Sequence, residues 1–203
     1  MKEIPMDNLK NMGYEGSFWF GNPSQEMKVI FDTGSAWAWL FSEDCKQGLC
    51  PMKNKKFMQS KSSGFKENKK AGQLLAYGKG AIAGHPSQDR ACFAGDNKSC
   101  IDKLSFLTVV KAKDVESLQG SGLIGLSPSP SKQEDIKEPM THGVAGFIAQ
   151  LKENEQFKKD YDPVFSIYLS NDEAVKGKVT FGGYDLKKYA QKGASDKDIF
   201  WID

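Results

Sequence analysis

The fold is decided by residues 29–41, V-I-F-D-T-G-S-A-W-A-W-L-F, in which an apolar run meets an acid, two hydroxyls and a glycine. The first three residues predict a buried strand, because β-branched and aromatic side chains favour sheets. Gly34 permits a sharp turn that would present Asp32 to a cavity. A buried carboxylate needs donors, which the turn's backbone and the hydroxyls of Thr33 and Ser35 can supply. The alternative is an Asp32 that only initiates the turn.

Length and charge limit the classes of function. The chain has 203 residues, with 28 Lys and Arg against 26 Asp and Glu. We expect one domain, 1–203, and a sizeable core. The basic residues are scattered apart from K-N-K-K at 53–56, so we expect neither a nucleic-acid groove nor a membrane partner. No run approaches the roughly 20 apolar residues of a membrane helix. The first ten residues lack the apolar core of a signal peptide, which we take to be absent or removed.

The four cysteines form two close pairs, Cys45 with Cys50 and Cys92 with Cys100, each around a polar loop that contains glycine. Neither pair has the spacing of a zinc knuckle or a redox motif. Two local disulfides are the economical interpretation, and they place the protein in an oxidising compartment. Four reduced thiols in a cytosolic protein are the alternative.

Two further features bear on the compartment and on metals. Asn97-Lys98-Ser99 is an N-glycosylation sequon, which is consistent with a secretory route. The histidines, His85 and His142, are isolated from each other and from the cysteine pairs. We therefore expect no metal site and no cofactor.

Apolar alternation between turn signals predicts a mostly β protein. Gly122 and Gly125 flank an apolar pair and predict a backbone pressed against another element. Residues 45–70 and 127–143 are polar or punctuated by proline and predict loops. We expect strands or hairpins at 14–31, 37–41, 73–84, 104–110, 121–126, 165–169, 178–181 and 198–203.

One amphipathic helix is expected at about 144–158. Val144, Phe147, Ile148 and Leu151 recur at helical spacing. Gln150 and its polar neighbours would then face away from the core.

These pieces, in this order, resemble the N-terminal lobe of a pepsin-like aspartic endopeptidase over nearly the whole chain. Y-E-G-S-F-W-F-G-N-P-S-Q-E-M-K-V-I-F-D-T-G-S-A-W-A-W is similar to the family's first hairpin and active-site strand. C-K-Q-G-L-C resembles its small disulfide loop, Y-G-K-G its flap, and S-G-L-I-G-L its apolar-apolar-Gly motif. F-S-I-Y-L and V-T-F-G-G-Y-D stand where the lobe ends. The resemblance implies an all-β lobe of short antiparallel strands, a double-psi type barrel or sandwich.

The resemblance also implies roles for the active-site loop. Asp32 would be one of two catalytic aspartates, and Gly34 would shape its loop. Ser35 would be a hydrogen-bonding neighbour, and Thr33 would serve the contact between lobes.

The same resemblance implies a flap that closes over a peptide or protein substrate. Tyr77 would be the flap tyrosine, hydrogen-bonded to the indole of Trp39, and Gly78 and Gly80 would give the tip its mobility. The pocket for the substrate residue before the cut would contain Ile30 and Leu123. Secreted and lysosomal or vacuolar locations fit this family.

The sequence departs from the family's pattern in one decisive respect: it contains no second Asp-x-Gly motif. The partner aspartate would belong to a second lobe or subunit outside residues 1–203. Two alternatives follow, namely an inactive single-lobe binding or structural protein and a homodimer that uses one Asp32 per subunit. Smaller departures are Lys79 in the flap, Asn22 in the first hairpin turn and Phe41 after the active-site strand.

Overall fold

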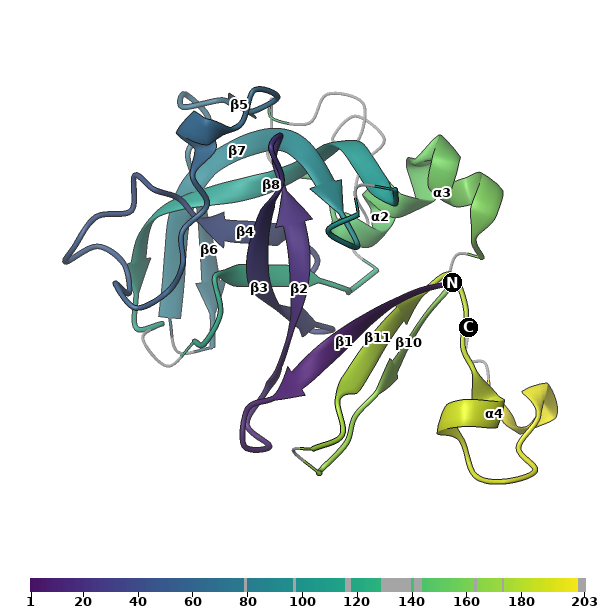
Figure 1. Ribbon diagram of the computed structural model, residues 1–203. Coiled ribbons are helices and arrows are strands. Elements are labelled where there is room, and N and C mark those ends of the chain that lie inside the picture. Colours follow the sequence, from purple (N-terminus) through teal and green to yellow (C-terminus); the bar gives the residue numbers. More distant parts are fainter. Residues whose placement is uncertain are drawn as a thin grey trace.

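The computed structural model describes residues 1–78, 80–96, 98–115, 118–128, 140, 144–162, 164–172 and 174–200. Within these residues eleven strands form one sheet in the order β10-β11-β1-β2-β3-β9-β4-β8-β7-β5, with β6 paired to β7. The expected all-β fold is confirmed (Figure 1). The strands are β1 Lys2–Asn8, β2 Tyr14–Phe20, β3 Gln25–Asp32, β4 Ala38–Phe41, β5 Lys66–Glu67, β6 Gln73–Tyr77, β7 Gly80–Cys92, β8 Cys100–Lys113, β9 Gly122–Gly125, β10 Phe165–Tyr168 and β11 Gly177–Phe181.

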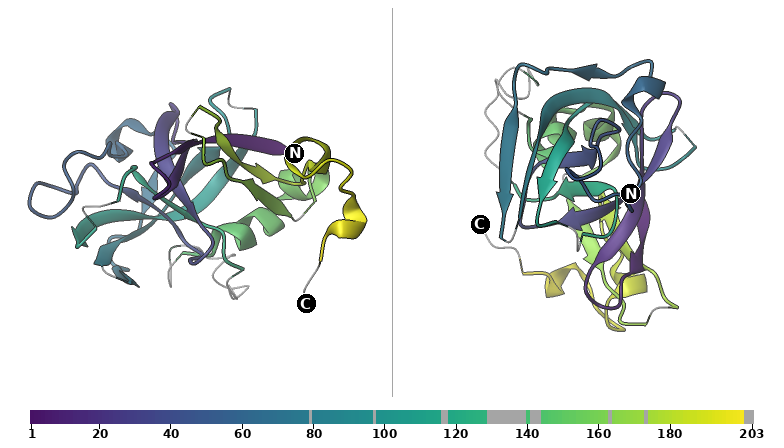
Figure 2. Two further views of the ribbon diagram at one scale, coloured as in Figure 1. Left: turned by 90° about the horizontal axis from the view of Figure 1, so that it is seen from below. Right: turned by 90° about the vertical axis from the view of Figure 1, so that its left-hand side faces the viewer.

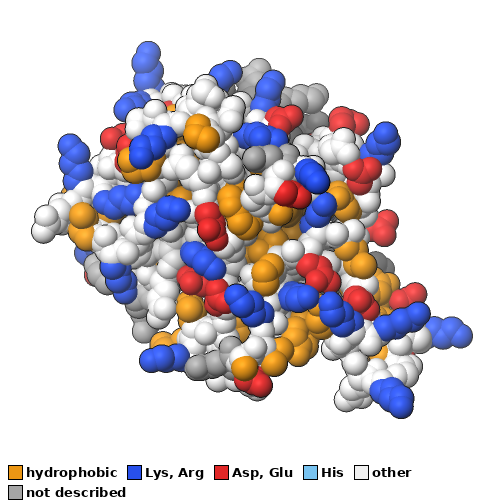
Figure 3. All heavy atoms as spheres, viewed as in Figure 1, with side chains coloured by type: hydrophobic (Ala, Val, Ile, Leu, Met, Phe, Trp, Pro, Cys, Tyr) orange, Lys and Arg blue, Asp and Glu red, His pale blue; other side chains and the backbone are white. Residues whose placement is uncertain are grey.

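The helices are short. They are α2 Phe147–Glu153, α3 Glu155–Asp160 and α4 Leu186–Tyr189, with two 3-10 turns at Gln59–Lys61 and Asp196–Asp198. Helices α2 and α3 lie together on one side of the sheet, and the segment with α4 lies at the margin of the molecule in every view (Figures 1 and 2). No described helix is long and apolar enough to cross a bilayer. Charged groups of both signs are interspersed over the face seen in Figure 3.

The β2–β3 hairpin forms where the sequence predicts it. Its apolar residues alternate, so that Phe18, Phe20, Met27 and Val29 point into the main core. Gly21 occupies the turn with φ +88°, a conformation that glycine adopts without strain.

Strand β9 inserts between β3 and β4. It runs parallel to β3 and antiparallel to β4, and β4 in turn runs parallel to β8. The insertion requires the close approach that the glycines predict, since a Cβ on Gly122 would lie 2.1 Å from the Trp39 carbonyl oxygen. All four residues of β4 are buried, so the strand has no solvent face.

The buried apolar side chains of the sheet and its neighbours form two clusters. The larger is built around stacked and edge-on phenylalanines, among them Phe18, Phe147 and Phe181. The smaller contains Trp39, Phe41, Leu123 and Val144, with Tyr77 packed against it. The smaller cluster lies under the β6–β7 hairpin and therefore supports the region around Asp32.

The single helix expected at 144–158 is wrong in its bounds and continuity. The chain becomes helical only at Phe147 and breaks at Asn154, whose side chain accepts a hydrogen bond from the Phe157 N–H at 2.9 Å. Phe157 follows Leu151 by six residues, so in a continuous helix the two side chains would lie on different faces. The break lets both side chains reach the core. Gln150 does not face away, because its amide exchanges hydrogen bonds with the Ser105 backbone.

The sequence interpretation missed β1 and misplaced the final strand. β1 pairs with both β2 and β11, and it buries Ile4 and Met6. Of the strand expected at 198–203, Asp198 ends a 3-10 turn, residues 199 and 200 are not in a strand, and residues 201–203 lie outside the described residues. Most of the predicted loop 127–143, including His142, also lies outside them.

Candidate active site

Asp32 is the last residue of β3, at the point where the strand enters the D-T-G-S turn. Both of its carboxylate oxygens accept hydrogen bonds. The Gly34 N–H lies 2.9 Å from Oδ1, and the Ser35 hydroxyl lies 2.6 Å from Oδ2. The side chain is half-buried, so the carboxylate combines fixed donors with access to solvent. Thr33 is exposed on the same turn.

The residues that follow β9 donate hydrogen bonds to the backbone of the D-T-G-S turn. The Leu126 N–H donates to the Asp32 carbonyl at 2.7 Å, and the Ser127 N–H donates to the Ser35 carbonyl at 2.9 Å. Gly125 is paired with Asp32, and a Cβ at this glycine would lie 2.5 Å from the Ser35 carbonyl oxygen. The sequence indicated the close approach of Gly125 but not that it fixes the aspartate loop.

The β6–β7 hairpin brings Tyr77 to the same site. The Trp39 indole N–H donates to the Tyr77 hydroxyl at 2.9 Å. Burial raises the pKa of Tyr77, the Trp39 and Ser35 side chains act in the opposite direction, and the charge of Asp32 raises it further. Tyr77 therefore remains a protonated phenol next to the Asp32 loop.

Gly80 of the flap has a packing role that the sequence did not predict, whereas a Cβ on Gly78 would meet nothing within 4 Å. Gly78 does not have a positive φ. A Cβ on Gly80 would lie 2.7 Å from the carbonyl oxygens of Lys113 and Asp114, so this glycine allows the flap to contact the end of β8. Lys79 lies outside the described residues, and the mobility of the tip stays a prediction.

Ile30 and Leu123, the expected pocket residues, are neighbours in the parallel pairing of β3 and β9. Ile30 is half-buried, and Leu123 belongs to the cluster that contains Trp39. Both precede the paired residues Asp32 and Gly125 by two positions on their strands. Their contact with a substrate remains a prediction.

Both predicted disulfides are present. Cys45–Cys50 and Cys92–Cys100 have Cα–Cα distances of 5.7 and 4.0 Å, and no described cysteine is free. Cys92 is the last residue of β7 and Cys100 the first of β8, and the two are paired in register. The sequon residue Asn97 lies outside the described residues. The described side chains include no cluster of three or more His, Cys, Asp or Glu that could hold a metal.

Several known proteins resemble this chain over nearly all of its length. The chain is 33% identical to pregnancy-associated glycoprotein 2 of Sus scrofa over 98% of its own length and 42% of the relative. It is 31% identical to vacuolar protease A of Neurospora crassa, over 93% and 44%, and 30% identical to pepsin A of Gallus gallus, over 98% and 48%. It spans less than half of each relative. The family model for eukaryotic aspartyl proteases matches residues 13–195, and the chain therefore belongs to the eukaryotic aspartyl protease family.

Proposed function

We propose that this chain is the N-terminal lobe of an aspartic endopeptidase and that Asp32 is one carboxylate of its catalytic pair. The observation that carries the proposal is the position of Asp32 at the end of β3, with both oxygens hydrogen-bonded and Tyr77 close to its loop. Ser35 and the Gly34 N–H act as positioning groups, because they fix the orientation of the carboxylate.

The chemistry follows from bringing a second carboxylate close to Asp32. Two such groups cannot both ionise, so they share one proton; aspartic proteases are the standard example of this like-charge effect. The ionised partner removes a proton from a bound water, which attacks the peptide carbonyl carbon. The protonated partner donates to the carbonyl oxygen, which gives a neutral tetrahedral diol. The C–N bond then breaks as the first carboxyl passes the proton it took from water to the leaving nitrogen and the second carboxylate takes a proton back from the diol, which restores the singly protonated pair. The pair titrates as a unit and is active at acidic pH, where one proton is retained.

The partners of this lobe follow from the same chemistry. A second lobe or subunit that carries an aspartate supplies the other carboxylate, and a peptide or protein chain is the substrate. Tyr77 and the flap close over that substrate and exclude water, which strengthens the electrostatic contacts inside. No cofactor is needed, because the nucleophile is water.

We also propose that the protein works in an oxidising compartment, secreted or lysosomal or vacuolar. Support comes from the two disulfides, which persist outside the reducing cytosol. One relative is named a vacuolar protease.

The test uses the full-length protein that carries this chain. Asp32→Asn should lower the cleavage of an unfolded protein at acidic pH by about 10³-fold or more, because general acid–base groups contribute about 10²–10⁴-fold each. Asp102→Asn, a change at an exposed carboxylate, is the matched control. A peptide analogue with a tetrahedral hydroxyl carbon at the scissile position should bind the wild type and not Asp32→Asn.

The alternatives predict different outcomes. A binding or structural protein would leave the unfolded substrate intact, both as wild type and as Asp32→Asn. A homodimeric peptidase would sediment as a dimer and cleave without a second lobe. Unchanged cleavage by Asp32→Asn would overturn the proposal.

A further inference from the structure

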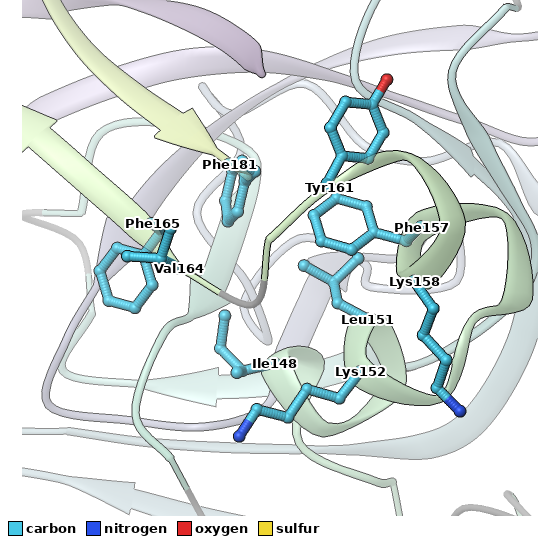
Figure 4. Close-up of a pocket in the computed structure, with 9 residues that line it drawn as sticks. All are labelled: Ile148, Leu151, Lys152, Phe157, Lys158, Tyr161, Val164, Phe165 and Phe181. Atoms are coloured by element: carbon cyan, nitrogen blue, oxygen red, sulfur yellow. The ribbon is translucent and has the colours of Figure 1, made fainter. Parts of the chain in front are cut away.

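An apolar pocket of about 330 Å³ lies where helices α2 and α3 face strands β10 and β11. This volume is at the lower end of the range for ligand sites, about 300–1,000 Å³. In Figure 4, Leu151 and Phe157 approach from the helices and Phe165 and Phe181 from the strands. None of the described residues that line the pocket belongs to the candidate active site.

The pocket wall is held in place by the main core. Phe181 is 1% exposed, and its ring lies 5.3 Å from that of Phe93 and 5.9 Å from that of Phe147. Phe157 stacks on Phe93 at 6.0 Å. Because these rings are fixed by packing, the pocket is preformed.

Tyr161 forms another part of the wall, and a glycine makes room for it. A Cβ on Gly182 would lie 2.5 Å from the Tyr161 Cβ, and Gly182 has φ +80°. The Gly182 N–H also donates to the Val164 carbonyl at 2.7 Å, which fixes the lining residue Val164. The width of the pocket therefore depends on this glycine.

The charged side chains that line the described pocket are both cationic. Two of the described lining residues, Lys152 and Lys158, are lysines and none is acidic. The Lys158 ammonium pairs with two carboxylates, Glu153 at 3.2 Å and Glu155 at 3.6 Å, whereas no described carboxylate lies within 4.0 Å of the Lys152 ammonium. In Figure 4 both lysine side chains point away from the aromatic rings, on flexible stems that can turn toward the opening. Lys2 adds a third cation, 5.9 Å from the centre of the Tyr161 ring.

We propose that this pocket binds an amphipathic carboxylate, a single hydrocarbon chain that ends in an acid group, as in a medium-chain fatty acid. The chain would occupy the space between Leu151, Phe157 and Phe181, where burial of apolar surface drives binding. The carboxylate would stay at the opening and pair with Lys152. The small volume favours one chain, and the lysines favour an anion over a neutral hydrocarbon.

The test is calorimetric titration of the full-length protein with dodecanoate, kept below its micelle concentration. We expect one molecule to bind per chain. Butyrate, which lacks the chain, should not bind, and dodecan-1-ol, which lacks the charge, should bind about fivefold more weakly, as expected for a contact of about 1 kcal/mol.

Variants locate the site. Ile148→Trp fills the pocket from its half-buried edge and should weaken dodecanoate binding more than tenfold. Lys152→Glu should weaken it at least about fivefold, whereas Lys159→Glu, an exposed lysine of α3 that does not line the pocket, should leave it unchanged. Circular dichroism verifies that each variant is folded. If Ile148→Trp does not fold, Ile148→Phe is used in its place.

Three results would overturn the proposal. The first is no binding of dodecanoate, and the second is equal binding of dodecanoate by wild type and Ile148→Trp. The third is self-association of the ligand-free protein that Ile148→Trp abolishes, which would show that a second copy covers the pocket.

Discussion

At the scale of single residues, the Tyr77 hydroxyl joins the flap to the body of the molecule. It accepts the Trp39 indole N–H at 2.9 Å, and the two rings lie 6.4 Å apart. Trp39 is 2% exposed, so its N–H has no ready access to water if Tyr77 withdraws. The closed position of the flap is therefore favoured by one hydrogen bond as well as by packing.

Tyr77→Phe should release the flap. The change keeps the ring but leaves the Trp39 N–H without its acceptor, at a cost of about 1–3 kcal/mol. Amide hydrogen exchange in β6 should become faster. Tyr14→Phe removes a comparable hydrogen bond, to the Ser170 carbonyl, and should not affect β6. Equal exchange in Tyr77→Phe and wild type would show that packing alone holds the flap.

Asp89 on β7 is a second informative residue. It is 1% exposed; Oδ1 accepts the Arg90 N–H at 2.8 Å, and Oδ2 is a buried oxygen without a partner in the described structure. Burial raises the pKa of Asp89, partly offset by Ser62 and the Arg90 backbone. The folded protein thus holds the Asp89 proton more tightly than the unfolded chain does.

A raised pKa makes Asp89 a source of pH dependence. The folded state binds the proton more tightly than the unfolded state, so stability should fall as the pH rises from about 4, the value for an unfolded Asp, through the raised pKa. Asp89→Asn should remove this loss, which urea unfolding at pH 4 and pH 7 would measure. Asp96→Asn, a change at an exposed site, should leave the pH dependence of stability as it is in the wild type. An equal pH dependence in Asp89→Asn and wild type would refute the assignment.

The sequence alone points to a role for Tyr77 but gives no sign of one for Asp89. Tyr77 stands next to a glycine-rich turn, and resemblance to a known family identified it with Trp39. Asp89 has no local signal, because its burial results from the packing of β7 against distant segments such as the one that contains Ser62.

At the scale of elements, β9 is the strand on which the site is built. It lies between β3 and β4 and holds the Asp32 loop through Leu126 and Ser127. Its insertion leaves no room for a side chain at Gly122.

Gly122→Ala should therefore destabilise the fold by about 3 kcal/mol, since the added Cβ meets the rigid backbone at Trp39. Gly72→Ala is the control, because a Cβ there has no neighbour within 4 Å. Chemical denaturation would measure both. A Gly122→Ala protein as stable as wild type would mean that β9 can shift without cost.

Elements also show where sequence patterns fail. Apolar periodicity located α2, but it could not show the break at Asn154, because the pattern does not reveal where a side chain will cap a new helix. β1 was missed because its apolar residues, Ile4 and Met6, are few and are separated by Pro5. Their alternation was a usable signal, but the strand is stabilised by β11, which follows much later in the chain.

At the scale of the whole molecule, the sheet ends in an edge strand. β10 is the last strand of the described sheet, and Ile167 on it and Leu169 just after it are 39% and 53% exposed. An unpaired edge with apolar side chains can pair with another chain.

The 203-residue chain expressed alone should self-associate as its concentration rises. Ile167→Lys should reduce that association, because a charge on an edge strand opposes pairing. Met12→Lys, a change at a 90% exposed side chain in a turn, should not. Sedimentation velocity would measure both, and a wild-type chain that stays monomeric at high concentration would contradict this prediction.

The pairing of Asp32 with Gly125 also determines when the site can form during folding. The D-T-G-S turn gains its support from residues that are synthesised long after it, so a short peptide with this motif should not orient its acid. Contacts between residues so distant in sequence form slowly, because closing a long loop costs entropy before any contact stabilises it. The aspartate should therefore acquire its geometry among the last steps of folding, and a nascent chain would have no ordered acid until β9 has docked.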